Sequence, residues 1–170
     1  VTSSVATDLV GTNHGTLTNM DLTADPDTAR ISDTDAGGIR ALSFDGTNDR
    51  VVIADNASYD IGTTDYGFSL WFRASSKPAS IGHMFRKAGT AVSGNAIYDG
   101  VFAILNSSGN VICGFRHTAS QNTDRVVTGS ADLCDNAWHN VVASFDRDSL
   151  LTVWVDGVSI GTASLAYAVA

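Results

Sequence analysis

The chain contains no glutamate, and this feature restricts its possible fold more than any other. All 18 acidic residues are aspartate, Gln121 is the only glutamine, and Lys77 and Lys87 are the only lysines. Long straight-chain residues favour helices, whereas the abundant valine and threonine favour strands and the serine, glycine and asparagine favour turns. The composition therefore predicts an all-β protein.

Length and net charge restrict the kinds of protein that this chain can be. A chain of 170 residues that is 44% hydrophobic can bury one sizeable core. A net charge of -8 opposes binding to nucleic acid through its phosphates. No apolar run approaches the length of roughly 18 residues that a membrane span needs, so we expect no membrane insertion. Residues 1–4 show neither a start methionine nor a signal pattern, so we expect a processed chain or a piece of a longer one.

Short β-like runs separated by turn residues recur from residue 40 onward. This spacing, with glycine, asparagine and aspartate between the runs, predicts a two-sheet antiparallel β-sandwich or jelly roll. Phe68, Leu70 and Phe72 alternate as the buried face of a strand must, and so do His139, Val141, Ala143 and Phe145. Asp156 and Gly157 predict a two-residue hairpin. We predict strands over residues 41–44, 50–53, 68–73, 81–85, 101–105, 111–115, 124–128, 138–145 and 151–155, with a return strand from 158.

Several of these runs also resemble a known family. Residues 41–49 resemble the opening of laminin-G-like, concanavalin A-like jelly-roll domains, and residues 68–72 resemble their third strand. Residues 137–142 are similar to their Trp-His-His-Val-Ala strand, with Asn140 in place of the second histidine, and residues 153–157 match their Tyr-Val-Asp-Gly hairpin. Asn13 to Leu17 resembles a segment that often precedes such domains.

The resemblance implies a domain organisation. Residues 1–39 are expected to form a polar arm with a short strand, and residues 40–170 the laminin-G-like sandwich. The family continues past the Asp-Gly hairpin into further strands, so we expect a sandwich that lacks its closing C-terminal strand. That strand would come from a neighbouring chain or from the N-terminal segment, unless the chain is a fragment.

The loop around Asp45, Asn48 and Asp49 is the best candidate for a metal site. Carboxylate and amide oxygens are the ligands that calcium prefers, and related domains often carry calcium at one rim. The alternative is a plain turn in which Asp45 and Asn48 bond to their own backbone.

Aromatic residues provide the candidate ligand site. A sugar ring stacks on tryptophan or tyrosine, while its hydroxyls need aspartate, asparagine or arginine. Trp71 and Trp154 have the parity opposite to the predicted core positions, and Tyr98 and Asp99 lie together in a loop. These four residues are the predicted ligand-binding set. The alternative is that a covering loop buries both faces of these strands, and we expect Trp138 in the core.

The remaining polar residues suggest no catalytic site. Cys113 and Cys134 predict either a disulfide or two small buried residues. The four histidines show no metal spacing, and no Gly-x-Ser-x-Gly elbow follows a strand. Asp146 and Asp148 flank Arg147 in what we expect to be a solvated hairpin tip.

Together these patterns predict a non-catalytic recognition module of a secreted or surface-displayed protein, which binds a glycan or a protein. The alternative is a structural or decoration domain of a virion or extracellular assembly, with an open sheet edge completed by a neighbouring chain. An enzyme is not expected, because the usual hydrolases of this fold need a pair of glutamates.

Overall fold

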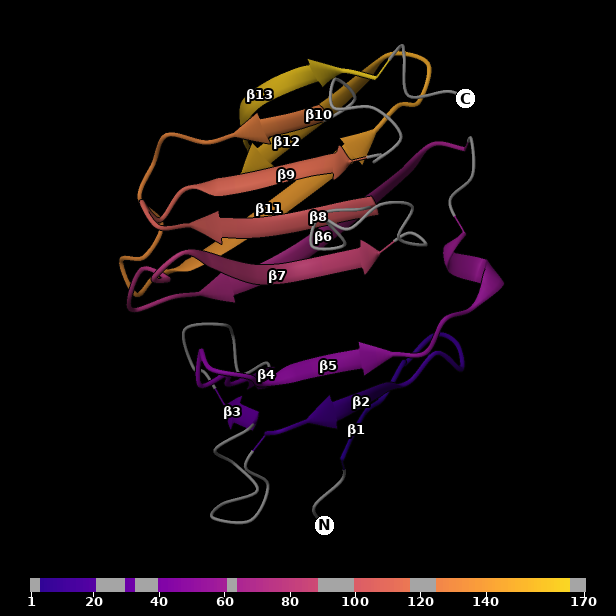
Figure 1. Ribbon diagram of the computed structural model, residues 1–170, viewed down its shortest axis with the longest axis vertical. Helices are drawn as coiled ribbons and strands as arrows, with labels where there is room; N and C mark the ends of the chain where they lie inside the picture. The colour runs from indigo at the N-terminus through magenta and orange to yellow at the C-terminus, as the bar shows by residue number, and fades with distance from the viewer. Residues whose placement is uncertain are drawn as a thin grey trace. The chain divides into compact units, whose positions relative to one another are not determined.

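The structure, a computed structural model, describes residues 4–20, 30–32, 40–60, 64–88, 100–116 and 125–165 (Figure 1). These residues form antiparallel strands and one 3-10 turn, Ala57–Tyr59, so the all-β prediction is confirmed. Within these ranges no helix has the length and apolarity to cross a membrane. The chain divides into two compact units, Val1–Asp60 and Ile61–Ala170. The predicted domain boundary after residue 39 falls inside the first unit.

The first unit is built from short strands. β1 (Val5–Ala6), β2 (Gly15–Thr18) and β5 (Arg50–Ile53) form one sheet in the order β1-β2-β5, while β3 (Arg30–Ser32) pairs with β4 (Arg40–Leu42). Leu17 and Met20 form its small buried cluster, against which Ala6, Leu42 and Val51 pack.

The second unit contains two four-stranded antiparallel sheets. The β11 sheet has the order β13-β12-β11-β6, and the β8 sheet has the order β10-β9-β8-β7. The strands are β6 (Tyr66–Arg73), β7 (Ile81–Ala88), β8 (Gly100–Asn106), β9 (Val111–Arg116), β10 (Arg125–Thr128), β11 (Trp138–Phe145), β12 (Leu150–Val155) and β13 (Val158–Ser164).

The core of this unit lies between the two sheets. Successive side chains in a strand point to opposite faces, so every second residue of β11 and β12 faces inward. The fully buried side chains come from both sheets and include Val111, Val141, Phe145, Leu151 and Val153. This shared core makes the second unit a β-sandwich.

The two long sides of the sandwich differ. On one side β10 approaches β13 so closely that a side chain at Gly161 would lie 3.1 Å from a Val127 methyl carbon. The other side ends in β6 and β7, where the rings of Phe68 and Phe85 pack with centroids 4.8 Å apart. Phe85 remains 37% exposed there.

Hairpin turns close the ends of the strands. Asp156 and Gly157 adopt φ angles of 51° and 79°, the left-handed conformation that a type I′ turn requires, so the predicted hairpin is confirmed. Between β8 and β9, the Asn106 side chain accepts the backbone N–H groups of Ser108 and Asn110. Gly109 supplies the positive φ of 82° that this turn needs.

Candidate functional site

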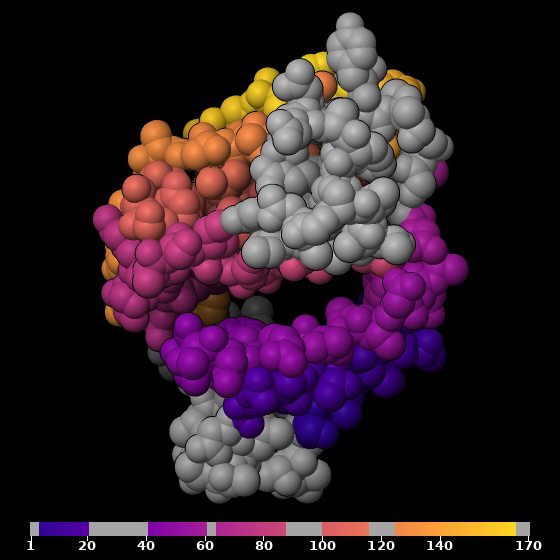
Figure 2. All heavy atoms as spheres, viewed as in Figure 1, coloured from indigo at the N-terminus to yellow at the C-terminus, as the bar shows by residue number. Residues whose placement is uncertain are grey.

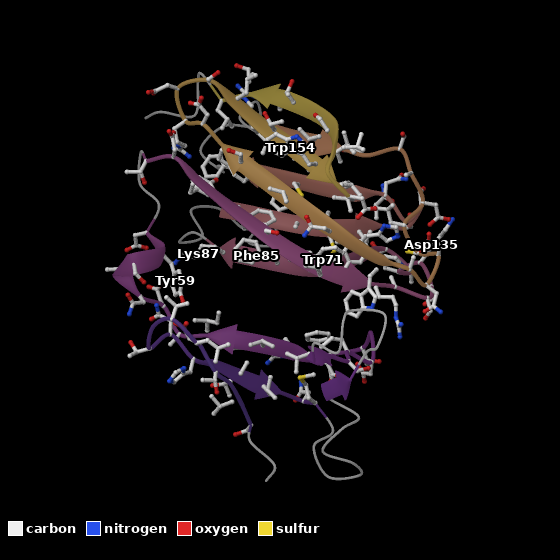
Figure 3. All side chains as sticks on the ribbon, turned by 180° about the vertical axis from the view of Figure 1, so that it is seen from behind. Tyr59, Trp71, Phe85, Lys87, Asp135 and Trp154 are labelled. Carbon is white, nitrogen blue, oxygen red and sulfur yellow. The ribbon has the colours of Figure 1, made fainter. Side chains whose placement is uncertain are left out.

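All three tryptophans of the chain lie on the outer face of the β11 sheet. Trp71 is on β6, Trp138 on β11 and Trp154 on β12, and each has the parity opposite to the buried residues of its strand. Figure 3 shows this sheet from its outer side, with Trp71 and Trp154 labelled. Trp71 is 66% exposed, whereas Trp138 and Trp154 are half-buried.

Strand register fixes the spacing of this aromatic face. Trp71 lies opposite Asn140, whereas Trp154 lies opposite Val142, whose other neighbour is Ser69. Trp71 and Trp154 are therefore two strands and one two-residue step apart, a Cα separation of about 12 Å from standard strand dimensions. The prediction that both tryptophans face away from the core agrees with this arrangement.

Asn140 lies on β11, the strand between those of the two tryptophans, and its side chain bonds to β6. Its side-chain amide donates to Ser69 Oγ at 3.2 Å and to the Leu70 carbonyl at 3.1 Å. These bonds hold the Asn140 side chain across the β6–β11 pair, beside Trp71. In the sequence, Asn140 is distinguished only by its departure from the family's Trp-His-His motif.

Trp138 was expected in the core, and this prediction is wrong. His139 faces inward, so the alternation of β11 turns Trp138 outward. On that face Arg73 lies opposite Trp138 in the β6–β11 pair. The Arg73 guanidinium carbon is 5.7 Å from the centroid of the Trp138 ring. The size of the side chain suggested burial, although the parity of its neighbours already indicated the opposite face.

The outer face of the β8 sheet differs from this aromatic face. The middle of β8 is buried on both of its faces, and Phe102 is only 3% exposed although it points outward. Its ring lies over Gly114, where a side chain would come within 3.0 Å of it. Figure 2 shows this side of the molecule, with the coloured strands from magenta β7 to orange β10. Among the described residues of the two sheets, the exposed tryptophan surface is on the β11 sheet.

A histidine held by two carboxylates lies at one end of the sandwich, and no pattern in the sequence indicated this arrangement. His139 is 8% exposed, with Nδ1 2.8 Å from Asp156 Oδ2 and Nε2 3.0 Å from Asp135 Oδ1. Burial disfavours the charged ring, but the bonds to Asp156 and Asp135 outweigh it and raise the His139 pKa above its usual value.

The two carboxylates are themselves fixed by backbone groups. Asp135 accepts the Ala137 N–H at 2.8 Å, and this bond and the one to His139 lower the pKa of Asp135. Partial burial opposes ionisation of Asp156, but His139 and the Asn140 N–H at 2.8 Å lower its pKa overall. The group is therefore a structural ion-pair cluster that closes the end of β11.

The predicted calcium loop is a network of its own hydrogen bonds. Asp45 Oδ1 accepts the Thr47 N–H at 2.7 Å, and Asp49 Oδ2 accepts the Asp45 N–H at 2.9 Å. Asn19 also donates to the Asn48 carbonyl at 3.2 Å. Among the described residues, no three histidine, cysteine or aspartate side chains converge as metal ligands. Calcium binding by Asp45, Asn48 and Asp49 stays a prediction.

The other predicted residues are placed as follows. Tyr98 and Asp99 lie outside the described residues. Cys113 and Cys134 are free thiols, so the predicted disulfide is not formed in the structure. Cys113 points into the core from the middle of β9, whereas Cys134 lies beside the turn at Gly109.

The hairpin tip at Arg147 is not fully solvated, contrary to the expectation from the sequence. Asp146 and Asp148 are exposed, but Arg147 is only 6% exposed. Its guanidinium carbon lies 5.1 Å from the Phe115 ring centroid, and its backbone N–H donates to Asp65 Oδ1 at 2.8 Å. A long arginine stem can cover apolar surface, which the charge pattern alone does not reveal.

The chain was compared with curated proteins and with solved structures. No curated protein sequence matches the chain. Two solved structures resemble it at low identity: HCR/D-Sa-GBL1/C (14% identity, TM-score 0.49) and the binding domain of Botulinum neurotoxin DC in complex with rat synaptotagmin II (17%, TM-score 0.46). Each match covers 68% of this chain, which spans only 27% of either of those chains.

A family model also matches the chain. The family model Laminin_G_3, described as the concanavalin A-like lectin/glucanases superfamily, matches residues 45–170, which is most of the chain. This range includes every strand of the sandwich. The chain belongs to the concanavalin A-like lectin/glucanases superfamily.

Proposed function

We propose that the chain is a non-catalytic recognition module whose aromatic face, formed by Trp71, Asn140 and Trp154, binds a glycan. The observation that carries this proposal is Trp71, a large aromatic side chain left 66% exposed in the middle of a regular strand. An indole offers a flat apolar surface that a ligand ring can cover. A location outside the cell, or on a cell or virion surface, goes with this proposal.

Polar groups around the indoles suit a hydroxyl-rich ligand. Asn140 and Ser69 lie beside Trp71 on the same face, and Arg73 lies one step further along β6. Amide, hydroxyl and guanidinium groups can all bond to sugar hydroxyls. A face with aromatic stacking surfaces and few fixed polar groups is typical of ligand sites.

We propose binding rather than catalysis because the strands of this face lack the carboxylates that glycoside hydrolysis needs. Glycoside hydrolysis ordinarily uses two carboxylic side chains that flank the scissile bond. The chain contains no glutamate, and the described strands β6, β11, β12 and β13 contain no aspartate. The superfamily name covers both lectins and glucanases, and this face suits the lectin type.

A glycan array followed by calorimetry on the best ligand tests the proposal. We expect Trp71→Ala and Trp154→Ala each to weaken binding by about tenfold or more, because each removes one stacking surface. Val158→Ala is the matched control, since Val158 is an exposed apolar residue on the hairpin outside the aromatic face. Undiminished binding by both tryptophan variants, or no bound glycan at all, would contradict the proposal.

A second function is favoured by the side of the sandwich that ends in β6 and β7. The inward-facing residues of β6, which include Phe68, are only half-buried, and Phe85 is exposed beside them. A strand from another chain can also join a sheet at its end strand. A structural role in an assembly of copies would use this side.

Light scattering distinguishes the two functions. Assembly predicts a mass above that of the 17.7 kDa monomer, which Phe85→Asp lowers, while Trp71→Ala leaves the mass unchanged. A chain that stays monomeric at high concentration would contradict the structural role and leave the glycan proposal unaffected.

A further inference from the structure

The turn residue Asp156 holds both backbone polar groups of Asn140. The Asn140 N–H donates to Asp156 Oδ1 at 2.8 Å, and the Asp156 N–H donates to the Asn140 carbonyl at 2.9 Å. These two bonds tie the turn between β12 and β13 to β11, at the residue whose side chain lies beside Trp71. A movement of the Asp156 carboxylate therefore reaches a residue of the aromatic face.

The same carboxylate bonds to the ring of His139 on the inner face of β11. Asp156 Oδ2 lies 2.8 Å from His139 Nδ1, while Oδ1 accepts the N–H of the next residue, Asn140. His139 lies opposite Phe72 in the β6–β11 pair. The adjacent cross-strand pair is Asn140 and Trp71. The buried cluster and the aromatic face are thus one residue apart on both strands.

The His139 ring needs its second proton to bond to both of its carboxylate partners. Its other nitrogen, Nε2, lies 3.0 Å from Asp135 Oδ1. An imidazolium donates from both nitrogens, whereas a neutral ring has one N–H and one lone pair. Loss of the proton therefore turns one contact into a lone pair against a carboxylate oxygen, and it removes the charge that strengthens the other. The contact to Asp156 is weaker in either tautomer of the neutral ring.

The surroundings of the ring favour its charged form in mildly acidic solution. Among the described residues, the charged groups that act on His139 are Asp156 and Asp135. From β6 the uncharged Phe72 ring faces it, with the two ring centroids 5.7 Å apart. Burial opposes the charged ring, but the bonds to Asp156 and Asp135 raise the His139 pKa above its usual value. The ring therefore loses its proton as the pH rises above about 6.5.

We propose that Asp156 is a positioning residue for the aromatic face, and that protonated His139 keeps it in place. In mildly acidic solution the Asp156 carboxylate is held between the ring and the Asn140 N–H. Loss of the ring proton lets this half-exposed carboxylate turn toward water, which loosens Asn140 beside Trp71. Weaker ligand binding in alkaline solution follows from this and rests on the proposed function, whereas the loosening of Asn140 does not.

Hydrogen exchange of the full chain, followed by NMR between about pH 5 and 9, tests the coupling without a ligand. We expect the protection factor of the Asn140 N–H to fall about threefold or more as the His139 ring titrates, and that of Val142, further along β11, to stay constant. Asp156→Asn should abolish the pH dependence at Asn140, because asparagine keeps the left-handed turn but carries no charge. His83→Gln, which removes an exposed histidine of β7, is the matched control and should preserve it. Constant protection of Asn140 while His139 titrates, or a pH dependence that survives in Asp156→Asn, would overturn the proposal.

Calorimetry with the best glycan of the array, in mildly acidic and in alkaline buffer, tests the consequence for binding. We expect binding to be about threefold or more weaker in the alkaline buffer. Asp156→Asn should remove this difference, and Asp148→Asn, an exposed aspartate away from His139, should retain it. Equal affinity in both buffers would contradict the positioning role and leave the proposed function intact. If no glycan binds, the proposed function fails, and the protection of the Asn140 N–H still decides the coupling.

Discussion

His139 Nδ1 lies 2.8 Å from Asp156 Oδ2, a contact that joins the inner face of β11 to the tip of the β12–β13 hairpin. Asp156 is thus both the left-handed residue of the turn and a partner of a buried ring. Because Asp135 bonds to the other ring nitrogen, the protonated ring satisfies both carboxylates at once. The stability of this end of the sandwich should therefore depend on pH.

The pH dependence has a defined sign. The His139 pKa is raised, so its contribution is complete below about pH 6.5 and is lost as the pH rises through the raised value. The Asp135 and Asp156 pKa values are lowered, so their contributions are present above about pH 4 and are lost in stronger acid. The cluster should stabilise most between about pH 4 and 6.5.

Asp156→Asn tests this dependence, because asparagine keeps the left-handed turn but carries no charge. We expect urea denaturation to show a loss of roughly 1 kcal/mol at pH 5, allowing for the half-exposed carboxylate, and a smaller loss at pH 9. Asp148→Asn, an exposed aspartate away from His139, is the control. An equal loss at both pH values would contradict the charged cluster.

Two turn glycines should differ in their tolerance of a side chain. Gly157 has open space around its Cβ position, so Gly157→Ala should cost only the strain of its positive φ, about 1–2 kcal/mol. At Gly109 the added carbon would also clash with the Asp132 carboxylate, which bonds Lys77 at 2.7 Å and the Cys134 N–H at 3.1 Å. Urea denaturation should therefore show a larger loss for Gly109→Ala, and equal losses would contradict this account.

The two cysteines should titrate as free thiols. Burial raises the pKa of Cys113 to about 12, and burial and Asp132 raise that of Cys134. We expect a thiol reagent at pH 8 to react slowly with the native chain and to detect both thiols after denaturation without reductant. If no thiol appears in denaturant, the disulfide predicted from the sequence is present instead.

Calcium binding at the Asp45 loop is open to a direct test. If the loop binds calcium, adding the ion to chelator-treated protein raises the unfolding temperature, because a ligand of the native state stabilises it. Asp49→Asn should remove that increase, and Asp60→Asn, outside the loop, should not. An unchanged unfolding temperature in the wild-type chain would leave Asp45 and Asp49 as turn residues.

The sequence by itself determined the fold class, most strands and the direction of Trp71 and Trp154. Alternation with a period of two residues is a local property of a strand, so the faces of β6 and β12 follow from neighbours in the chain. The Asp156–Gly157 turn is local in the same way. The same alternation places Trp138 on the outer face of β11, although the size of its side chain suggested burial.

Only the tertiary structure decided which of these faces and ends meet. His139 contacts Asp156, 17 positions away, through the return of β12 beside β11. Asn140 bonds to Ser69, 71 residues away, because β6 pairs with β11. The close approach of Gly129 to Ile160 depends on a bulge between β12 and β13 and on the approach of β10 to this hairpin. Such contacts depend on strand order and on the packing of two sheets, which local periodicity does not encode.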